Sequence, residues 1–440
     1  MSWTYHPELL ARPVPRYTSY PTAAEFHAGV GAADMQAALA SVATGTEVSV
    51  YVHIPYCRDI CWYCGCNTGA ANKAQRLASY LQGLEAEIDL VAARLAGRGR
   101  IGRIAFGGGS PNAVAPADFL GLVARLRDRF AADEAALSVE LDPRSLTDEW
   151  LAAMAAARVA RASMGVQTLD PKVQAAIGRI QPEASIRRAV SGLRDAGVHS
   201  INFDLMYGLP GQGEAELRRT LEATLEMAPE RIALFGYAHV PHLLPRQRRI
   251  DAVALPDAAA RFAQAALGFR LLTEAGYEPV GFDHFALPHD PLAVAAHAGT
   301  LRRNFQGFTD DPAEVLIGLG ASAISQFPRL LVQNEKNAGR YRMLVSAGRL
   351  PAERGIVRSA EDRMRGRVIE ALLCRGEADA GAFGIGELRA RLAPFEHAGL
   401  VRWAATALTI EEAGRPYARS IAAAFDAWRA PDGRQFSSAI

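Results

Sequence analysis

The chain of 440 residues is poor in cysteine and histidine, with 5 of the first and 10 of the second. It also lacks an excess of either charge, because 48 Lys and Arg stand against 47 Asp and Glu. A balanced chain has no strong field that would attract nucleic acid or an anionic membrane, so neither is expected as a partner. No run approaches the roughly 20 apolar residues that span a bilayer. The first residues also lack the basic and apolar segments of a secretion signal, so we expect a cytoplasmic protein.

The overall composition is that of an ordinary globular protein, with 50% hydrophobic and 22% charged residues. This excludes a mostly disordered chain and a fibrous one. At roughly 100–200 residues per domain, the length allows one large catalytic domain and one smaller partner. We expect the protein to be a monomer.

From residue 48 onward, short β-branched segments alternate with longer helical ones. Strand–helix–strand units of this length place successive strands parallel in one sheet. With polar or Gly-rich residues after the strands, the pattern predicts an α/β fold, a partial (β/α)6 barrel whose site lies at the carboxyl ends of its strands. A flat doubly wound sheet would give a similar pattern. The strands are expected to begin near Val48, Ile101, Ser138, Ala162, Ile201 and Arg231.

The composition changes twice along the chain, which suggests three parts. Residues 1–47 are irregular and rich in Pro and Tyr, and we expect them to form an N-terminal extension that covers the active site. Residues 48–355 are expected to form the catalytic barrel with its C-terminal additions. Residues 356–440 have a helix–helix–hairpin pattern that indicates a small, mostly helical, winged-helix-like domain. Since residues 385–398 are not rich in Lys or Arg, DNA binding is not expected there.

Four of the five cysteines fall within ten residues, at Cys57, Cys61, Cys64 and Cys66. In a reducing cytosol, clustered thiols are typical of metal ligands rather than disulfides. A zinc knuckle usually needs a second pair of ligands downstream, and a bacterial ferredoxin spacing ends in Cys-Pro; neither is present. A purely structural metal loop is the alternative. The fifth cysteine, Cys374, lies in an apolar helical pattern and is expected in the core.

The spacing C-x3-C-x2-C of Cys57, Cys61 and Cys64 resembles the radical S-adenosylmethionine superfamily. The resemblance implies that these three residues bind a [4Fe–4S] cluster and leave one iron open, where the amine and carboxylate of S-adenosylmethionine can chelate. The cluster would then reduce the sulfonium to methionine and a 5′-deoxyadenosyl radical. Cys66 is not needed as a ligand. It is our candidate catalytic residue, with a spare thiol or a buried small hydrophobe as alternatives.

The recognisable pattern extends beyond the cysteine loop, to residues 15–23, 51–57, 61–67, 106–111, 163–167, 203–210, 237–239, 283–286, 303–309 and 320–325. With these segments, in this order, the chain resembles the oxygen-independent coproporphyrinogen III dehydrogenase (oxidase) family over nearly its whole length. This resemblance implies that a 5′-deoxyadenosyl radical removes a hydrogen from the β-carbon of a propionate, followed by loss of CO2 and one electron. Two propionates of coproporphyrinogen III, on rings A and B, would become vinyls and give protoporphyrinogen IX, with two S-adenosylmethionine molecules bound. The electron donor and acceptor are unidentified.

The resemblance also assigns cofactor contacts. Glycines at a strand end let a ligand approach the backbone closely, carboxylates accept hydrogen bonds from a ribose diol or an ammonium, and an arginine binds a carboxylate. We place Arg179 in the helix after the fourth strand. By resemblance, the first S-adenosylmethionine contacts Tyr51, Gly108 and Glu140, and the second contacts Tyr63, Gly109, Ser110, Gln167, Arg179, Asp204, Ala238 and Ile324. Departures from the family pattern are few: Tyr63, Ser110 and Asn112 replace Phe, Thr and Thr, Gly211 replaces Lys, and Ala162 replaces Leu.

The substrate carries four propionates, and Arg16, Arg246, Arg248 and Arg303 are candidates to bind them. One alternative is a haem-binding chaperone of the same superfamily, whose members generally lack the fourth cysteine and the segment at residues 15–22 that this chain has. Another is a radical methyltransferase or haem-degrading relative, which would not release CO2.

Overall fold

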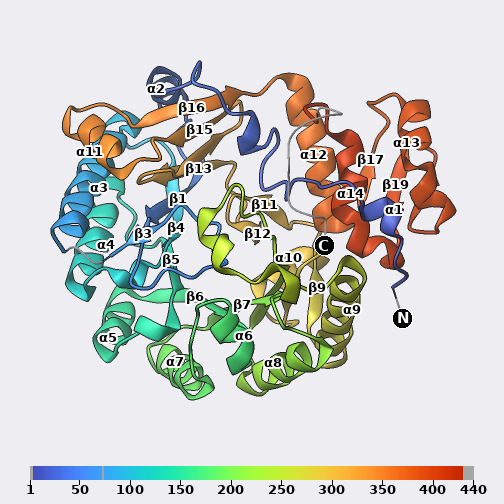
Figure 1. Cartoon of the computed structure of the whole chain (residues 1–440). Helices are drawn as coiled ribbons and strands as arrows, with labels where there is room; N and C mark the ends of the chain where they lie inside the picture. Colours follow the sequence, from blue (N-terminus) through green and yellow to red (C-terminus); the bar gives the residue numbers. More distant parts are fainter. Residues whose placement is uncertain (1–2, 72–73, 430–440) are drawn as a thin grey trace.

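One large mixed β-sheet lies at the centre of the computed structural model, which describes residues 3–71 and 74–429 (Figure 1). All the strands expected from the sequence are present, and they lie in the sheet in their order along the chain. Because every crossover then runs in the same direction, the helices cover one face and the sheet curls, which excludes the doubly wound alternative. These strands are β1 (Glu47–Ile54), β4 (Arg100–Gly108), β5 (Ala136–Leu141), β6 (Val159–Gln167), β7 (Ser200–Tyr207) and β8 (Arg231–Gly236).

The barrel stays open because both of its edges are extended rather than joined. Beside β1 lies a further parallel strand, and three antiparallel strands continue the sheet from there. Two antiparallel strands extend the other edge beyond β8. The first group comprises β13 (Val315–Leu319), β14 (Ile324–Phe327), β15 (Leu330–Asn334) and β16 (Ala352–Val357); the second comprises β10 (His284–Ala286) and β9 (Glu278–Val280).

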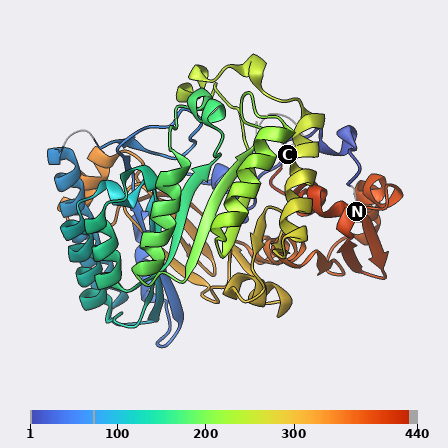
Figure 2. The ribbon, with the colours of Figure 1, turned by 90° about the horizontal axis from the view of Figure 1, so that it is seen from below.

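Helices form an outer layer around the convex face of the sheet, as the two ribbon views show (Figures 1 and 2). The outer helices are α3 (Ala74–Leu95), α4 (Pro116–Phe130), α5 (Asp148–Ala157), α7 (Glu183–Asp195), α8 (Glu214–Met227) and α9 (Ala258–Glu274). Two of them begin with a side-chain cap: at α5, Thr147 Oγ1 accepts a hydrogen bond from the Trp150 amide, and at α9, Asp257 accepts one from the Ala260 amide. Shorter helices are α6 (Pro171–Ala176), α10 (Pro291–His297) and α11 (Ala338–Ser346).

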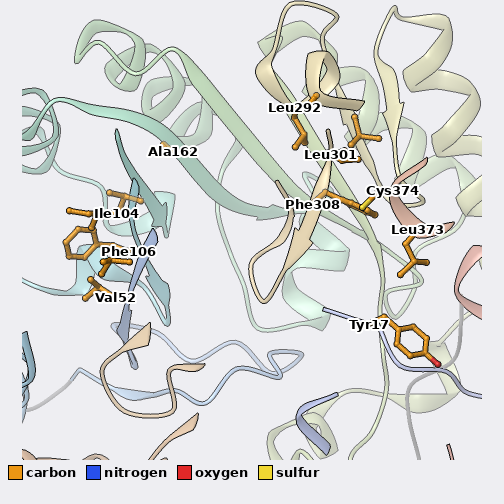
Figure 3. Packing of buried hydrophobic residues seen from close by; sticks show 14 of the residues in the cluster. Tyr17, Val52, Ile104, Phe106, Ala162, Leu292, Leu301, Phe308, Leu373 and Cys374 are labelled. Carbon is orange, nitrogen blue, oxygen red and sulfur yellow. The ribbon is translucent and has the colours of Figure 1, made fainter. Parts of the chain in front are cut away.

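The core lies between the sheet and these helices. Val52, Ile104 and Phe106 gather there from β1 and β4 (Figure 3), and each is at most 1% exposed. Phe106 packs edge-on against Phe119 of α4, at 5.1 Å between ring centroids. Such aromatic pairs add about 1 kcal/mol each beyond the burial of their area. Cys374 is buried among apolar side chains, as expected.

An ion-pair network covers the amino ends of the barrel strands. Asp310, which follows the hairpin of β11 (Arg302–Asn304) and β12 (Gly307–Thr309), accepts hydrogen bonds from Arg103 at 2.9 Å and from Arg161 at 2.8 Å. The two arginines lie near the starts of β4 and β6. This end of the barrel is therefore closed, and the opposite, carboxyl end is left for a ligand.

The C-terminal part forms a small separate sheet with helices beside it. Its strands are antiparallel in the order β17-β19-β18. The helix–helix–hairpin order agrees with the sequence pattern, while the domain boundary at residue 356 stays a prediction and residues 430–440 lie outside the described residues. The elements are α12 (Ala360–Arg375), β17 (Glu377–Asp379), α13 (Ile385–His397), β18 (Val401–Ala404), β19 (Ala407–Ile410) and α14 (Ala418–Ala422).

The N-terminal segment, with α1 (Pro7–Leu10) and α2 (Ala32–Ala40), connects this C-terminal part to the barrel (Figure 1). The Tyr417 hydroxyl donates to the Thr4 carbonyl at 2.7 Å, and the Tyr17 hydroxyl donates to Asp426 at 3.0 Å. Arg16 donates to the Gly236 carbonyl at the end of β8, at 3.3 Å. None of the described helices is long and apolar enough to cross a membrane.

Candidate active site

A cavity of about 190 Å³ lies at the carboxyl ends of β4 to β7 and is lined by Cys57, Cys61, Cys64 and Cys66. The cysteine loop follows β1 and is held by two short strands, β2 (Tyr56–Cys57) and β3 (Gly69–Ala70), which pair in parallel. In the middle of the cysteine loop, the Trp62 amide donates a hydrogen bond to the Ile177 carbonyl at 3.1 Å. The fold therefore brings the predicted ligand loop to the expected end of the barrel.

Most of the other predicted site residues line the same cavity. Three do not: Tyr51 lies on β1, Ala238 follows β8, and Ile324 begins β14. The Tyr51 hydroxyl lies 3.2 Å from His53 Nδ1, and the Ala238 carbonyl accepts a hydrogen bond from Gln247 at 3.0 Å. The predicted residues that line the cavity with the cysteines are Tyr63, Gly108, Gly109, Ser110, Glu140, Gln167, Arg179 and Asp204.

Two guanidinium groups contact the thiol of Cys61. Arg179 Nη1 donates to Cys61 Sγ at 3.2 Å, and Arg144 Nη2 donates to the same sulfur at 3.4 Å. Asp142 lies between them, 2.6 Å from Arg144 and 3.3 Å from Arg179. Although burial acts in the opposite direction, the hydrogen bonds from Arg144 and the charge of Arg179 hold the pKa of Asp142 below its usual value. Two guanidinium groups thus direct positive charge at one sulfur of the loop, which suits an anionic group bound there.

Arg179 does not lie in a helix, contrary to the sequence expectation. The helix after β6 ends at Ala176, and Arg179 lies in the connection between α6 and α7. Gly178 has a φ of +65°, and a Cβ at this position would come within 2.5 Å of the Trp62 ring. Gly178, with its left-handed backbone conformation, ends α6, and the indole of Trp62 in the cysteine loop occupies the space that a side chain at this position would need.

The glycines at the end of β4 allow close packing of neighbouring protein groups, while the close approach of a ligand to them stays a prediction. A Cβ on Gly107 would lie 2.4 Å from a Glu140 carboxylate oxygen, and one on Gly109 would lie 2.5 Å from the Tyr56 carbonyl. Gly108 has a φ of +107°, and a Cβ there would meet the His53 ring. Side chains at these positions would displace the carboxylate and the cysteine loop from the cavity.

Two half-buried carboxylates face the cavity. Glu140 accepts a hydrogen bond from the Gly108 amide at 3.1 Å, and burial raises its pKa to about 7. Asp204 accepts hydrogen bonds from the Ser163 hydroxyl at 3.0 Å and from the Asn202 amide group at 2.9 Å, and burial raises its pKa as well. Both groups keep free lone pairs for a ligand that presents hydroxyl or ammonium donors.

The sequence analysis missed three neighbours of the cavity. Arg144 and Asp142 follow the third strand in the run Leu-Asp-Pro-Arg, a strand-end signal that could have identified them. His53 is 9% exposed, and burial lowers its pKa to about 4, so its ring is neutral at physiological pH. Its Nε2 lies 3.3 Å from the Ser322 hydroxyl.

The four arginines proposed as substrate clamps are spread over the molecule. Arg246 lines the cysteine cavity and donates to the Thr68 hydroxyl at 3.0 Å. Arg248 is exposed on the segment after β8. Arg16 and Arg303 lie outside this cavity but next to each other, because Arg303 Nη2 donates to the Arg16 carbonyl at 3.0 Å.

The thiols do not form a site for a single metal ion. In the described part of the chain, no group of three or more His, Cys, Asp or Glu side chains could hold one ion. The predicted ligands Cys57, Cys61 and Cys64 instead surround a cavity, with two guanidinium groups directed at one of them. This arrangement fits a larger, anionic metal cluster better than a zinc ion.

Comparisons with known proteins agree with this arrangement. Residues 51–224 match the family model of the radical SAM superfamily. The oxygen-independent coproporphyrinogen III oxidase of Bradyrhizobium diazoefficiens is 43% identical over 437 residues, covering 97% of both chains. That of Paracoccus denitrificans is 42% identical, covering 94% of both chains.

A solved structure is also similar to nearly the whole chain. The coproporphyrinogen III oxidase HemN from Escherichia coli, a radical SAM enzyme, superposes with a TM-score of 0.91 at 34% identity, covering 98% of this chain and 100% of that one. Similarity at this level extends over the barrel, the N-terminal segment and the C-terminal part alike. The chain therefore belongs to the oxygen-independent coproporphyrinogen III oxidase family of the radical SAM superfamily.

Proposed function

We propose that the protein converts the ring A and ring B propionates of coproporphyrinogen III to vinyl groups without oxygen, giving protoporphyrinogen IX. The observation that carries the proposal is the cavity at the open end of the barrel, where the cysteine loop meets Glu140 and Asp204. Full-length similarity to proteins named for this activity supports the substrate. Each propionate loses one hydrogen atom, one CO2 and one electron, and the electron passes to an unidentified acceptor.

The radical SAM superfamily implies a [4Fe–4S] cluster and S-adenosylmethionine as cofactors. In the proposal, Cys57, Cys61 and Cys64 bind the cluster, and the fit rests on their shared cavity and on the guanidinium groups beside Cys61. When both cofactors are bound, they supply a 5′-deoxyadenosyl radical as the hydrogen-abstracting agent. All five cysteines are free thiols, which suits the reducing cytoplasm.

The residues around the cavity bind and orient the cofactor. Glu140 and Asp204 accept hydrogen bonds from hydroxyl or ammonium groups, and Arg179 offers its guanidinium to a carboxylate. We propose two S-adenosylmethionine molecules. The first contacts Tyr51, Gly108 and Glu140, and the second contacts Tyr63, Gly109, Ser110, Gln167, Arg179, Asp204, Ala238 and Ile324.

In the proposal, two parts of the structure limit the access of water to the 5′-deoxyadenosyl radical. The Asp310 network closes the amino ends of the strands, and the N-terminal segment lies at the carboxyl end of β8. Exclusion of water prevents side reactions of reactive intermediates. In the proposal, Cys66 lies close to the substrate as a proton or electron donor, and the protein acts as a monomer.

The test is an anaerobic product assay. Protein reconstituted with iron and sulfide is mixed with coproporphyrinogen III, S-adenosylmethionine and dithionite, and the oxidised product is analysed by mass spectrometry. We expect the loss of two carboxyl groups from the porphyrin. Tight haem binding without vinyl formation, or a gain of one methyl group, would contradict the proposal and favour a chaperone or a methyltransferase.

A further inference from the structure

A short 3₁₀ helix, Pro143–Ser145, follows β5 and directs Arg144 towards the cysteine loop. The buried side chain of Asn112 holds the start of this turn on both sides. It accepts a hydrogen bond from the Asp142 amide at 3.0 Å and donates one to the Asp142 carbonyl at 2.9 Å. The same Asn112 amide group donates to the Ser145 hydroxyl at 3.0 Å. The backbone that carries Arg144 is therefore fixed relative to the ends of β4 and β5.

The guanidinium group of Arg144 is itself held by Asp142. Arg144 Nε donates to Asp142 Oδ1 at 2.9 Å, and Nη2 donates to Oδ2 at 2.6 Å, so the pair is bidentate. The side chains of Arg144 and Asp142 are 13% and 9% exposed. In this position Nη2 also donates to Cys61 Sγ at 3.4 Å, and a largely buried guanidinium group lies against one sulfur of the loop.

Cys61 is the one predicted cluster ligand in the described chain whose sulfur accepts hydrogen bonds from guanidinium groups. Arg179 donates the second of them, at 3.2 Å, and lies 3.3 Å from Asp142. Two cations thus share one carboxylate, which leaves positive charge beside the sulfur. Arg179 is also our candidate to bind a carboxylate of the cofactor, whereas Arg144 has no other proposed ligand.

We propose that Arg144 raises the reduction potential of the iron–sulfur cluster by donating a hydrogen bond to Cys61 Sγ. The inference rests on the proposed function for the presence of the cluster. On reduction the cluster gains one electron and no proton, and the reductant loses that electron. The reduced cluster is more negative, so hydrogen bonds to its sulfurs and nearby positive charge stabilise it relative to the oxidised form.

The role of Arg144 is that of a positioning residue rather than a catalytic one, because it acts through the sulfur. Cleavage of the sulfonium needs an electron on the cluster, and a higher potential increases the fraction of cluster that a given reductant can reduce. A purely structural ion pair has a different consequence. Losing it changes Tm and leaves the potential where it was.

The test is a reductive titration of the reconstituted protein without S-adenosylmethionine or porphyrin, followed by the EPR signal of the reduced cluster. For Arg144→Gln we expect the equilibrium constant of reduction to fall about tenfold, which for one electron is a shift of about 59 mV to more negative potential. Arg144→Lys keeps the charge but loses the planar fork that reaches the sulfur, so its potential should lie between those of wild type and Arg144→Gln.

Arg58→Gln is the matched control. Arg58 follows Cys57 in the same loop, but it is exposed and forms no ion pair with the described residues. Water and salt screen such a charge, so its loss should leave the potential unchanged. A wild-type potential in Arg144→Gln, or equal shifts in Arg144→Gln and Arg58→Gln, would overturn the proposal.

Iron content and Tm show whether each variant is folded and carries the cluster. If Arg144→Gln does not assemble it, Arg144→Lys decides the matter. A more negative potential than that of wild type supports the role of Arg144, and an unchanged potential excludes it.

The two proposals fail separately. If the wild type forms vinyl groups while Arg144→Gln has the wild-type potential, the role of Arg144 is wrong and the reaction stands. If the potential depends on Arg144 but no vinyl group forms, the role of Arg144 stands and the reaction is wrong. A wild type that assembles no cluster contradicts both, which its iron content shows before any titration.

Discussion

At the scale of single residues, Cys61 and Cys66 occupy different environments although they lie in one loop. Cys61 is buried and receives hydrogen bonds from Arg144 and Arg179. Cys66 is exposed, and its amide donates to Cys64 Sγ at 3.4 Å. The first environment suits a metal-bound thiolate, whereas the second leaves the thiol accessible to another molecule.

We expect Cys57→Ala, Cys61→Ala and Cys64→Ala each to abolish assembly of the iron–sulfur cluster, because these three residues are the protein ligands of the proposed site and each variant removes one of them. Cys66→Ala should keep the cluster. The measurement is the brown absorbance and the iron content after anaerobic reconstitution. Cluster retention in any of the first three variants would contradict the ligand assignment, and cluster loss in Cys66→Ala would indicate a fourth protein ligand.

Local spacing explains why the sequence displays the cysteine pattern and does not display which distant residues contact it. Cys57, Cys61 and Cys64 lie within one short segment, so the sequence itself displays their pattern. Arg144 reaches Cys61 from 83 residues away, and Arg303 meets Arg16 across 287 residues. Only the fold creates those contacts, and an arginine after a strand has many other uses.

At the scale of secondary-structure elements, Asp310 ties β4 and β6 together at the closed end of the barrel. Its side chain is 9% exposed, and those of Arg103 and Arg161 are 28% and 27% exposed. Although burial acts in the opposite direction, hydrogen bonds from both arginines lower the pKa of Asp310 far below its usual value. Because its pKa is lower in the folded protein than in the unfolded chain, the carboxylate stabilises the fold fully at pH values above the unfolded pKa. This stabilisation is lost as the pH falls towards the folded pKa.

Asp310→Asn should lower the free energy of unfolding by about 3 kcal/mol at pH 7, because it leaves two partly buried guanidinium groups without their anion. The difference from wild type should be constant above pH of about 4, the ordinary pKa of Asp, and shrink as the pH falls below it. Urea unfolding at several pH values measures this.

Asp195→Asn, at the exposed end of α7, is the matched control and should change the free energy of unfolding by less than about 0.5 kcal/mol. An Asp310 variant as stable as this control at pH 7 would show that the network contributes nothing.

The sequence predicted the central strands and not the edges of the sheet. The runs that begin near Val48, Ile101 and Ile201 lie between clear helical segments, and each became a parallel strand. No strand was expected between residues 240 and 355, because β9 and β10 are only three residues long and Val315–Leu319 is interrupted by Gly318. These strands depend on neighbours already in the sheet, which local patterns do not contain.

At the scale of the whole molecule, the N-terminal segment is fixed to the C-terminal part rather than to the barrel alone. The Tyr417 hydroxyl donates to the Thr4 carbonyl at 2.7 Å and accepts from the His6 amide at 2.9 Å. Figure 1 shows α1 beside the C-terminal helices. An extension over the active site was expected from its Tyr- and Pro-rich composition, but its partner could not be, because over 400 residues separate the two.

Tyr417→Phe should weaken this contact, since it removes both hydrogen bonds and keeps the ring. We expect the free energy of unfolding to fall by about 1–2 kcal/mol. Trypsin should also cleave the N-terminal segment faster after Arg16, which is exposed and is followed by Tyr17. Limited proteolysis followed by mass spectrometry measures the cleavage rate.

Tyr5→Phe is the control, because in the described chain the Tyr5 hydroxyl makes no hydrogen bond while its ring packs on Phe262. Equal cleavage of the two variants would mean that Tyr417 does not hold the segment.

The contact between the two ends of the chain also bears on how the protein is made. During synthesis the first residues leave the ribosome long before Tyr417 and Asp426 exist, so Thr4 and Tyr17 have no partner until translation is nearly complete. The barrel can therefore fold before the N-terminal segment docks, and the segment reaches its final position only when the last residues have emerged.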